Sequence, residues 1–231
     1  MQAKPFFITG TDTEVGKTFC TVALLHAFAQ RGLRVAGMKP IAAGVGATNG
    51  LNDDVVALMA AGTVATHLSD VNPYCFARPI APHIAAAEEN CQISIAQIQQ
   101  SLQRLKSVSD VVLIEGAGGF LVPLDDSTSM ADLAVAMGAP VILVVGMRLG
   151  CLNHALLSAE AIRARGLQLA GWIANCIDPD MMAQNENIKS LETRLNTPLL
   201  GIMPYLSHTV GDNAEQDADT AKYLNIEPLL A

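Results

Sequence analysis

The residues best suited to chemistry stand at positions 10–18, which read Gly-Thr-Asp-Thr-Glu-Val-Gly-Lys-Thr. Glycines let the backbone turn so that several N–H groups face one anion, and the start of a following helix adds partial positive charge. Lys17 can reach the terminal phosphates of a nucleotide, and the Thr18 hydroxyl can ligate Mg²⁺. The pattern therefore predicts a loop that binds a nucleoside triphosphate.

The loop departs from the usual phosphate-binding pattern in its spacing. Five residues separate Gly10 from Gly16, where four are usual, and Thr11 stands in the usual glycine position. A strand-to-helix turn that merely contains Gly-Lys-Thr is the alternative. The apolar run before the loop and the helix expected after it favour the phosphate loop.

A second lysine stands where it could join the first. Lys39 follows a candidate strand at residues 34–38 and precedes Pro40. Because the carboxyl ends of parallel strands face the ligand crevice, we expect Lys39 to point at the phosphates beside Lys17. A solvated surface lysine is the alternative.

Carboxylates at similar positions could hold the metal that phosphoryl transfer requires. Glu115 follows the apolar run at 111–114 and opens the glycine-rich segment 115–119. A hard carboxylate oxygen at a strand end suits Mg²⁺, although a structural turn would also explain the glycines. Asp53 and Asp54, taken alone, are typical of a helix cap.

The elements that must position these residues alternate along the chain. Continuous apolar runs, typical of strands buried on both faces, occupy residues 6–8, 111–114, 141–145 and 169–174, with weaker candidates at 34–38 and 199–202. Helix-like stretches lie at 17–30, 54–61, 95–106, 130–137, 153–165 and 181–195. This alternation predicts a doubly wound α/β fold. We expect residues 44–50 to form a mobile loop and the tail after Leu206 to be loosely held.

Composition excludes several classes of protein. The chain has 231 residues, 51% of them hydrophobic and 16% charged, which indicates one folded domain spanning 1–231 rather than disorder. No apolar run is long enough for a membrane span, and we find no signal peptide. A net charge of −8 argues against nonspecific binding to nucleic acid or anionic lipid. Five scattered cysteines favour a reducing cytoplasm over a disulfide framework or zinc site.

Together, the motifs of this chain resemble one family of enzymes. The chain resembles the ATP-dependent dethiobiotin synthetases over nearly its whole length, in the segments 10–18, 39–40, 71–74, 82–84, 115–119, 140–145, 149–154, 170–175 and 198–201. The resemblance implies a homodimer whose subunit is a single P-loop domain with a mostly parallel sheet of about seven strands.

The resemblance also implies a reaction. Members of this family close a cyclic urea on 7,8-diaminononanoate, using CO₂ and Mg-ATP, in biotin biosynthesis. One substrate amine becomes a carbamate, which attacks the γ-phosphate to give a carbamic-phosphoric anhydride. The second amine then attacks the carbonyl carbon and expels phosphate.

Family roles can be carried over by motif, residue by residue. The resemblance implies Mg²⁺ ligands at Thr18, Asp54 and Glu115, with the neighbouring Asp53 as an alternative to Asp54. It implies a nucleotide site at Glu14, Val15, Gly16, Lys17, Thr18, Gly116, Ala117, Gly118, Asn175, Cys176, Pro204, Tyr205 and Leu206. It implies catalytic roles for Thr13, Lys17 and Lys39, and substrate contacts from Thr13, Lys39, Ala43, Gly150, Cys151, Leu152 and Asn153. The last four would bind the substrate carboxylate across the dimer.

Two positions differ from the family pattern. Ala43 stands where some members have serine, and Cys176 stands where the family often has aspartate.

Three other functions compete with that of the family, and each would need a feature that this sequence lacks. A partitioning or septum-site ATPase would have a lysine in place of Asp12. A GTPase-like module would have a lysine after Asn175. A cobyrinate-type amidase would need an amidotransferase domain, for which 231 residues leave no room.

Overall fold

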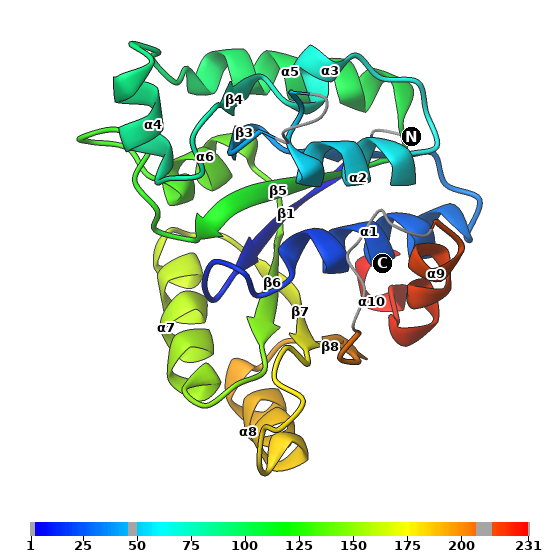
Figure 1. The fold of residues 1–231 in the computed structure, drawn as a ribbon. Helices are drawn as coiled ribbons and strands as arrows, with labels where there is room; N and C mark the ends of the chain where they lie inside the picture. The colour runs from blue at the N-terminus through cyan, green and yellow to red at the C-terminus, as the bar shows by residue number, and fades with distance from the viewer. Residues whose placement is uncertain (1–2, 46–49, 207–213, 231) are drawn as a thin grey trace.

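The apolar runs of the sequence become the strands of one parallel sheet (Figure 1). The strands are β1 (Lys4–Gly10), β2 (Val35–Met38), β5 (Val111–Gly119), β6 (Val141–Gly146), β7 (Leu169–Asn175) and β8 (Leu199–Met203). Their order is β2-β5-β1-β6-β7-β8, and each neighbouring pair runs parallel. The α/β fold and all six predicted strand positions are confirmed.

The computed structural model describes residues 3–45, 50–206 and 214–230, and for 214–216 only the backbone. The predictions of a mobile loop at 44–50 and of a loosely held tail after Leu206 fall mainly on residues 46–49 and 207–213. Those residues lie outside the described ranges.

The prediction of about seven strands is wrong, because the main sheet has six strands within the described residues. Strands β3 (Ile41–Ala43) and β4 (Tyr74–Phe76) form a separate two-stranded parallel sheet. Pro40 explains the break, because proline has no N–H to donate to a sheet neighbour. The N–H of Lys39 instead donates to the carbonyl oxygen of Val71 at 2.8 Å. The chain thus leaves the main sheet beside Lys39, at the sheet's carboxyl edge.

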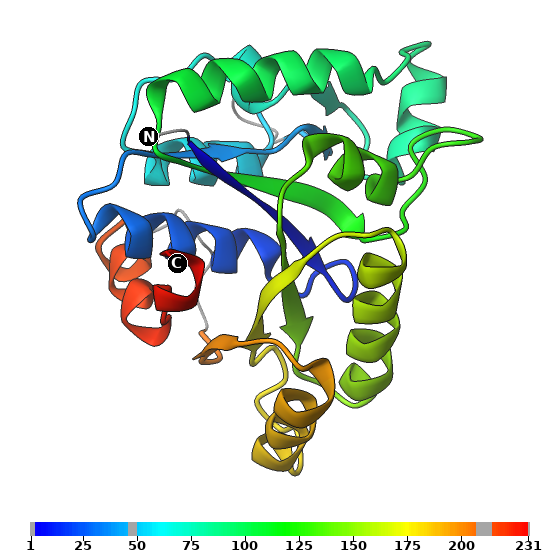
Figure 2. The same cartoon turned by 180° about the vertical axis from the view of Figure 1, so that it is seen from behind.

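Helices cover both faces of the sheet (Figures 1 and 2). One face packs against α1 (Lys17–Ala29), α2 (Asp53–Ala61), the 3₁₀ helix η1 (Thr220–Tyr223) and α10 (Glu227–Leu230), with α9 (Ala214–Asp219) beside α1. The other face packs against α5 (Ile95–Val108), α6 (Met130–Met137), α7 (Cys151–Ala164) and α8 (Gln184–Leu195). Side chains alternate between the two cores: Phe6 and Ile8 face α1, whereas Phe7 faces the opposite side.

The helix predictions are confirmed in position, with differences of one to three residues at some of their ends. Helix α7 begins at Cys151 rather than 153, and α8 begins at Gln184 rather than 181. The short helices α3 (Leu68–Val71) and α4 (Pro82–Glu88) and those of the C-terminus were not predicted. Among the described residues, each helix is too short or too polar to cross a membrane.

The C-terminal segment packs against the edge strand β8. Residues 204–206 follow directly after this strand. The N–H of Asn225 donates to the carbonyl oxygen of Leu200 at 2.6 Å, and Gly201 and Leu224 form an antiparallel bridge. A Cβ on Gly201 would lie 2.1 Å from the carbonyl oxygen of Tyr223. Gly201 is therefore required by close packing of backbone against backbone.

We expect Gly201→Ala to lower the free energy of unfolding, measured by urea denaturation, by about 1–3 kcal/mol, because the methyl group forces η1 away from β8. Gly62→Ala is the matched control, since a Cβ there would meet its nearest neighbour at an ordinary 3.4 Å. Equal unfolding midpoints for the two variants would show that the close approach at β8 does not contribute to stability.

Candidate active site

The loop between β1 and α1 has the backbone shape expected of an anion cradle. Glu14 and Gly16 have left-handed backbones, with φ of 59° and 77°. Such residues turn successive N–H groups toward one side of the loop, and α1 begins directly afterwards at Lys17. Val15 is 1% exposed and packs in the core facing α1, so it anchors the loop while its neighbours face solvent.

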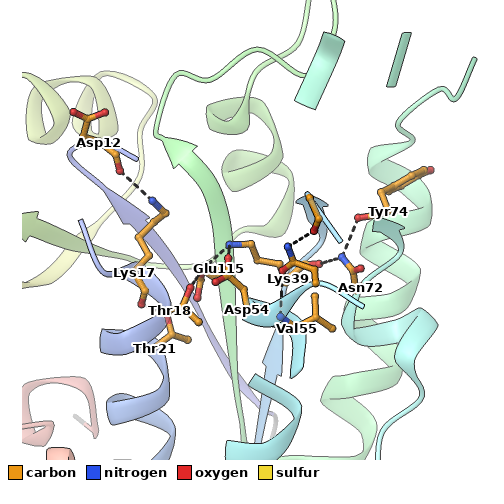
Figure 3. Close-up of polar contacts among 12 residues, drawn as sticks. Asp12, Lys17, Thr18, Thr21, Lys39, Asp54, Val55, Asn72, Tyr74 and Glu115 are labelled. Carbon is orange, nitrogen blue, oxygen red and sulfur yellow. Dashed lines mark hydrogen bonds and ion pairs between the residues drawn. The ribbon is translucent and has the colours of Figure 1, made fainter. Parts of the chain in front are cut away.

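Lys17 lies folded over this loop (Figure 3). Its Nζ donates to the carbonyl oxygen of Asp12 at 3.0 Å, and the residue is buried. Burial lowers the pKa of Lys17, and the positive charge of Lys39 lowers it further. The described residues give Lys17 no ion-pair partner, so the site holds a desolvated ammonium that a phosphate group would stabilise.

Asn175, at the end of β7, binds the backbone of the phosphate loop. Its Nδ2 donates to the carbonyl oxygen of Val15 at 2.9 Å, and the residue is 4% exposed. A Cβ on Gly16 would lie 2.1 Å from this Nδ2. Glycine at position 16 is therefore needed both for its left-handed backbone and for the close approach of Asn175.

A second group of charged residues converges at the carboxyl edge of β2 and β5 (Figure 3). The Lys39 Nζ lies 2.6 Å from Glu115 Oε1 and 2.8 Å from Asp54 Oδ2. The Thr18 hydroxyl donates to the same Glu115 Oε1 at 2.8 Å. The structure thus brings together four predicted residues, from α1, α2, β5 and the residue that follows β2, and Asp54 rather than the exposed Asp53 lies in this group.

The electrostatics of this group depend on burial. The side chain of Glu115 is 0% exposed and that of Lys39 is 6% exposed. Burial by itself lowers the pKa of Lys39, but the charges of Glu115 and Asp54 outweigh it, and the pKa lies above its usual value. Burial likewise tends to raise the pKa of Asp54, and the Lys39 ammonium brings it below the usual range. Lys39 and Asp54 are therefore held in their charged forms near neutral pH.

Asn72, which sequence reasoning did not single out, fixes the backbone of Lys39. Its buried Nδ2 donates to the carbonyl oxygens of Lys39, at 2.6 Å, and of Tyr74, at 2.9 Å. With the bond from the Lys39 N–H to Val71, both backbone polar groups of the lysine are bound to the segment before β4. The only available signal was that Asn72 lies in the family-like segment 71–74.

Both groups face one cavity of about 790 Å³. Of the predicted residues, its lining includes Thr13, Glu14, Gly16, Lys17, Thr18, Lys39, Ala43, Asp54, Glu115, Ala117 and Gly118. It also includes residues that were not predicted, namely Asn52, Pro79, Ile80, Ala81, Pro82 and Val122. Two residues predicted for the nucleotide site do not line the cavity. Val15 is buried in the core, and Gly116 lies within β5 against Phe7. The cavity has a charged end and an apolar side wall.

A second, smaller pocket of about 250 Å³ lies beyond the loop. Its lining brings together all the residues predicted for the nucleotide base, with two that were not predicted: Asn175, Cys176, Pro204, Tyr205 and Leu206, with Phe19 and Ile177. Asn175 is thus shared between this pocket and the phosphate loop.

The start of α7 lies apart from the cavity of its own chain. Residues 150–153 are absent from the described lining of that cavity. Gly150 has a left-handed φ of 95°, and the preceding Leu149 is 96% exposed. Arg148 forms an ion pair with Asp12 at 2.5 Å, so it joins this segment to the phosphate loop.

The donor set suits Mg²⁺ better than a transition metal. Within the described residues there is no group of three or more His, Cys, Asp or Glu side chains that could hold a metal. Two carboxylates and a hydroxyl converge instead, and hard oxygen ligands with room for water and phosphate are typical of Mg²⁺. Glu115 Oε2 is buried without a hydrogen-bond partner in the described structure, so it has unused capacity to bind a cation.

Comparison with known proteins identifies the family. An AAA domain family matches residues 4–213. The ATP-dependent dethiobiotin synthetase BioD of Aromatoleum aromaticum is 52% identical over 89% of this chain and 92% of that protein. The protein of the same name from Ralstonia nicotianae is 46% identical over 97% and 96%. The chain belongs to the dethiobiotin synthetase family. The resemblance predicted from the motifs is confirmed.

Solved structures of other proteins share the fold of this synthetase family member. The septum site-determining protein MinD from Pyrococcus horikoshii, complexed with Mg-ADP, superposes with a TM-score of 0.57 over 97% of this chain and 87% of that chain, at 17% identity. MinD from Aquifex aeolicus gives 0.55 at 16% identity. At such identity the likeness concerns the fold alone.

We expect Asn175→Ala to weaken the binding of inorganic tripolyphosphate, measured by calorimetry, about fivefold, the factor for a hydrogen bond worth about 1 kcal/mol. Tripolyphosphate carries no base, so a loss of affinity would reflect the hydrogen bond from Asn175 to the carbonyl oxygen of Val15 and not a contact with the base.

Asn187→Ala is the matched control, because Asn187 makes the same kind of bond, at 2.8 Å to the carbonyl oxygen of Ala183, on α8. If Asn175→Ala binds tripolyphosphate as tightly as the control, Asn175 does not organise the loop.

Proposed function

We propose that this chain closes the ureido ring of dethiobiotin on 7,8-diaminononanoate, with CO₂ and Mg-ATP, as an ATP-dependent carbon–nitrogen ligase of biotin biosynthesis. One observation carries the proposal: the phosphate loop and the Lys39 group face the same cavity. The support from sequence is identity of 46–54% to dethiobiotin synthetases over most of the chain.

The cavity suits a reaction between two anions. In the proposed reaction, CO₂ adds to one amine and gives a carbamate. A carbamate oxygen attacks the γ-phosphorus, ADP leaves, and a carbamic-phosphoric anhydride results. The second amine attacks the carbonyl carbon, and phosphate leaves as the ring closes. A carbamate and a triphosphate repel each other, so the site must place cations between them.

Two lysines from different elements would supply that charge. Lys17 stands at the start of α1, where it would reach the β- and γ-phosphates, and Lys39 stands opposite, where it would contact the carbamate and the γ-phosphate. Thr13 lines the same cavity beside them. We assign these three residues to catalysis, because positioned charges and hydrogen-bond donors stabilise the transferring phosphoryl group.

Thr18, Asp54 and Glu115 would hold the Mg²⁺ that accompanies the nucleotide. When bound, this ion neutralises charge on the β- and γ-phosphate oxygens. The pocket formed by Phe19, Asn175 and residues 204–206 would take the base, and Cys176 places a thiol in it where the family often has a carboxylate.

We further propose that two copies of the chain form the working unit. Helix α7 would offer its first N–H groups, at residues 150–153, to the substrate carboxylate in the cavity of the other copy. Leu149, Leu157 and Leu121 are 96%, 57% and 56% exposed, which leaves apolar surface beside α7 for a partner. In this proposal each subunit is one ATP-binding catalytic domain, spanning 1–231, that acts in the cytoplasm, where ATP is available.

We expect Lys17→Ala to lower phosphate release from Mg-ATP, in the presence of bicarbonate and 7,8-diaminononanoate, by at least about a hundredfold, as for loss of one transition-state donor. Lys189→Ala, at an exposed position on α8, is the control.

In the unaltered protein, phosphate release should require the diamine, and mass spectrometry should find the ring-closed product. Phosphate release at the same rate with and without the diamine would refute the proposed function.

A second prediction concerns the shared site. Lys17→Ala and Asn153→Asp should each be inactive alone, because one lacks the phosphate cation and the other repels the substrate carboxylate. Mixed dimers should regain activity, because the loop of one subunit and α7 of the other then form one intact site. Mixtures without activity, despite confirmed subunit exchange, would place both residues in the site of a single chain.

A further inference from the structure

Lys39 lies where a cation for the acid pair would be expected. Its ammonium contacts Glu115 Oε1 at 2.6 Å and Asp54 Oδ2 at 2.8 Å, and the Thr18 hydroxyl donates to the same Glu115 oxygen. The three groups proposed to hold Mg²⁺ are therefore already joined through one lysine and one carboxylate oxygen (Figure 3).

The burial of Glu115 explains why this contact forms. A fully buried carboxylate is unfavourable unless a cation and hydrogen bonds compensate it, and Lys39 is its ion-pair partner among the described residues. A divalent cation on the same oxygens would stand close to the ammonium, and like charges at that distance repel strongly in a buried site. The ammonium and a metal ion therefore compete for the acid pair.

We propose that Lys39 serves as a built-in counter-cation that keeps divalent metal off Asp54 and Glu115 until nucleotide arrives. The incoming triphosphate then gives the displaced ammonium a new anionic partner, so the metal enters together with the nucleotide. This inference deepens the proposed function and rests on it for the identity of the incoming anion.

The surrounding structure allows this exchange without movement of the main chain. The backbone of Lys39 is held on both sides, by Asn72 and Val71. The cavity is lined by Lys39, Lys17 and both carboxylates, so the lysine side chain has space in front of it on the side of the phosphate loop. Displacement needs only rotation about side-chain bonds.

Binding of Mn²⁺ to the nucleotide-free protein, followed by electron paramagnetic resonance of the free ion, tests the inference. Lys39→Met and Lys39→Gln should bind Mn²⁺ at least about tenfold more tightly than the unaltered protein, because the competing charge is gone. Lys17→Gln is the matched control, since it removes a buried lysine of the same cavity whose ammonium donates to the carbonyl oxygen of Asp12 and acts on the acid pair only from a greater distance. It should change Mn²⁺ affinity much less.

Adding Asp54→Asn to Lys39→Gln should abolish the gained affinity, which would place the ion at the acid pair. The Gln side chain of Lys39→Gln can still donate a hydrogen bond to Glu115. This variant therefore tests the inference if Lys39→Met does not fold. Equal Mn²⁺ affinity with and without Lys39 overturns the inference, as does an equal gain in Lys17→Gln or a gain that survives Asp54→Asn.

Nitrogen NMR of the lysine ammonium groups in the unaltered protein tests the inference independently, because it follows the Lys39 ammonium directly. Mg²⁺ alone should leave the Lys39 signal unchanged, and Mg²⁺ with a nonhydrolysable ATP analogue should shift it. A shift with Mg²⁺ alone overturns the inference. These measurements involve no turnover, so their failure is distinct from failure of the diamine-dependent phosphate release.

Discussion

The site depends on the cost of holding charge away from water. Glu115 lies on the buried strand β5, where an uncompensated carboxylate would be strongly unfavourable. Lys39 meets this requirement because β2 ends at Met38, just before the lysine, and leaves its side chain beside Glu115 of β5. The break at Pro40 thus leaves a cation beside the buried carboxylate. It also creates a pair of charges that a phosphate and a metal can later separate.

Charge alone does not make a binding site, because flexible charged groups lose entropy when a ligand orders them. In this chain, buried amides hold the backbone in advance. Asn175 binds the phosphate loop at Val15, and Asn72 binds Lys39. Asn175 ends the sheet strand β7 and Asn72 follows α3, so elements packed in the hydrophobic core orient the anion-binding groups. This arrangement links the two cores of the fold directly to the proposed chemistry.

The sequence predicted those features that have a local signature. Strands buried on both faces appear as continuous apolar runs, and all six were located; the glycines and lysine at 10–18 marked the phosphate loop. The expected seventh strand is absent from the described sheet because Pro40 diverts the chain into the β3–β4 pair. Helices α3 and α4 are too short to show a helical period. The role of Asn72, and the contact of Arg148 with Asp12 from 136 residues away, depend on tertiary structure that no local pattern encodes.

The shape of the cavity explains why a second chain belongs in the proposed mechanism. Its charged end gathers both lysines and both carboxylates, whereas Pro79, Ile80 and Val122 give its side wall an apolar surface that matches the hydrocarbon chain of a diamino acid. The far end of such a substrate is an anion, and residues 150–153, proposed to bind it, are not in the described lining of this cavity. The start of α7 is partly exposed, at Gly150 and Asn153, and it does not line the cavity of its own chain. A partner that turns α7 toward this cavity would complete the site with an element each chain already has, and would keep the two anion-binding ends far enough apart to select substrate by length.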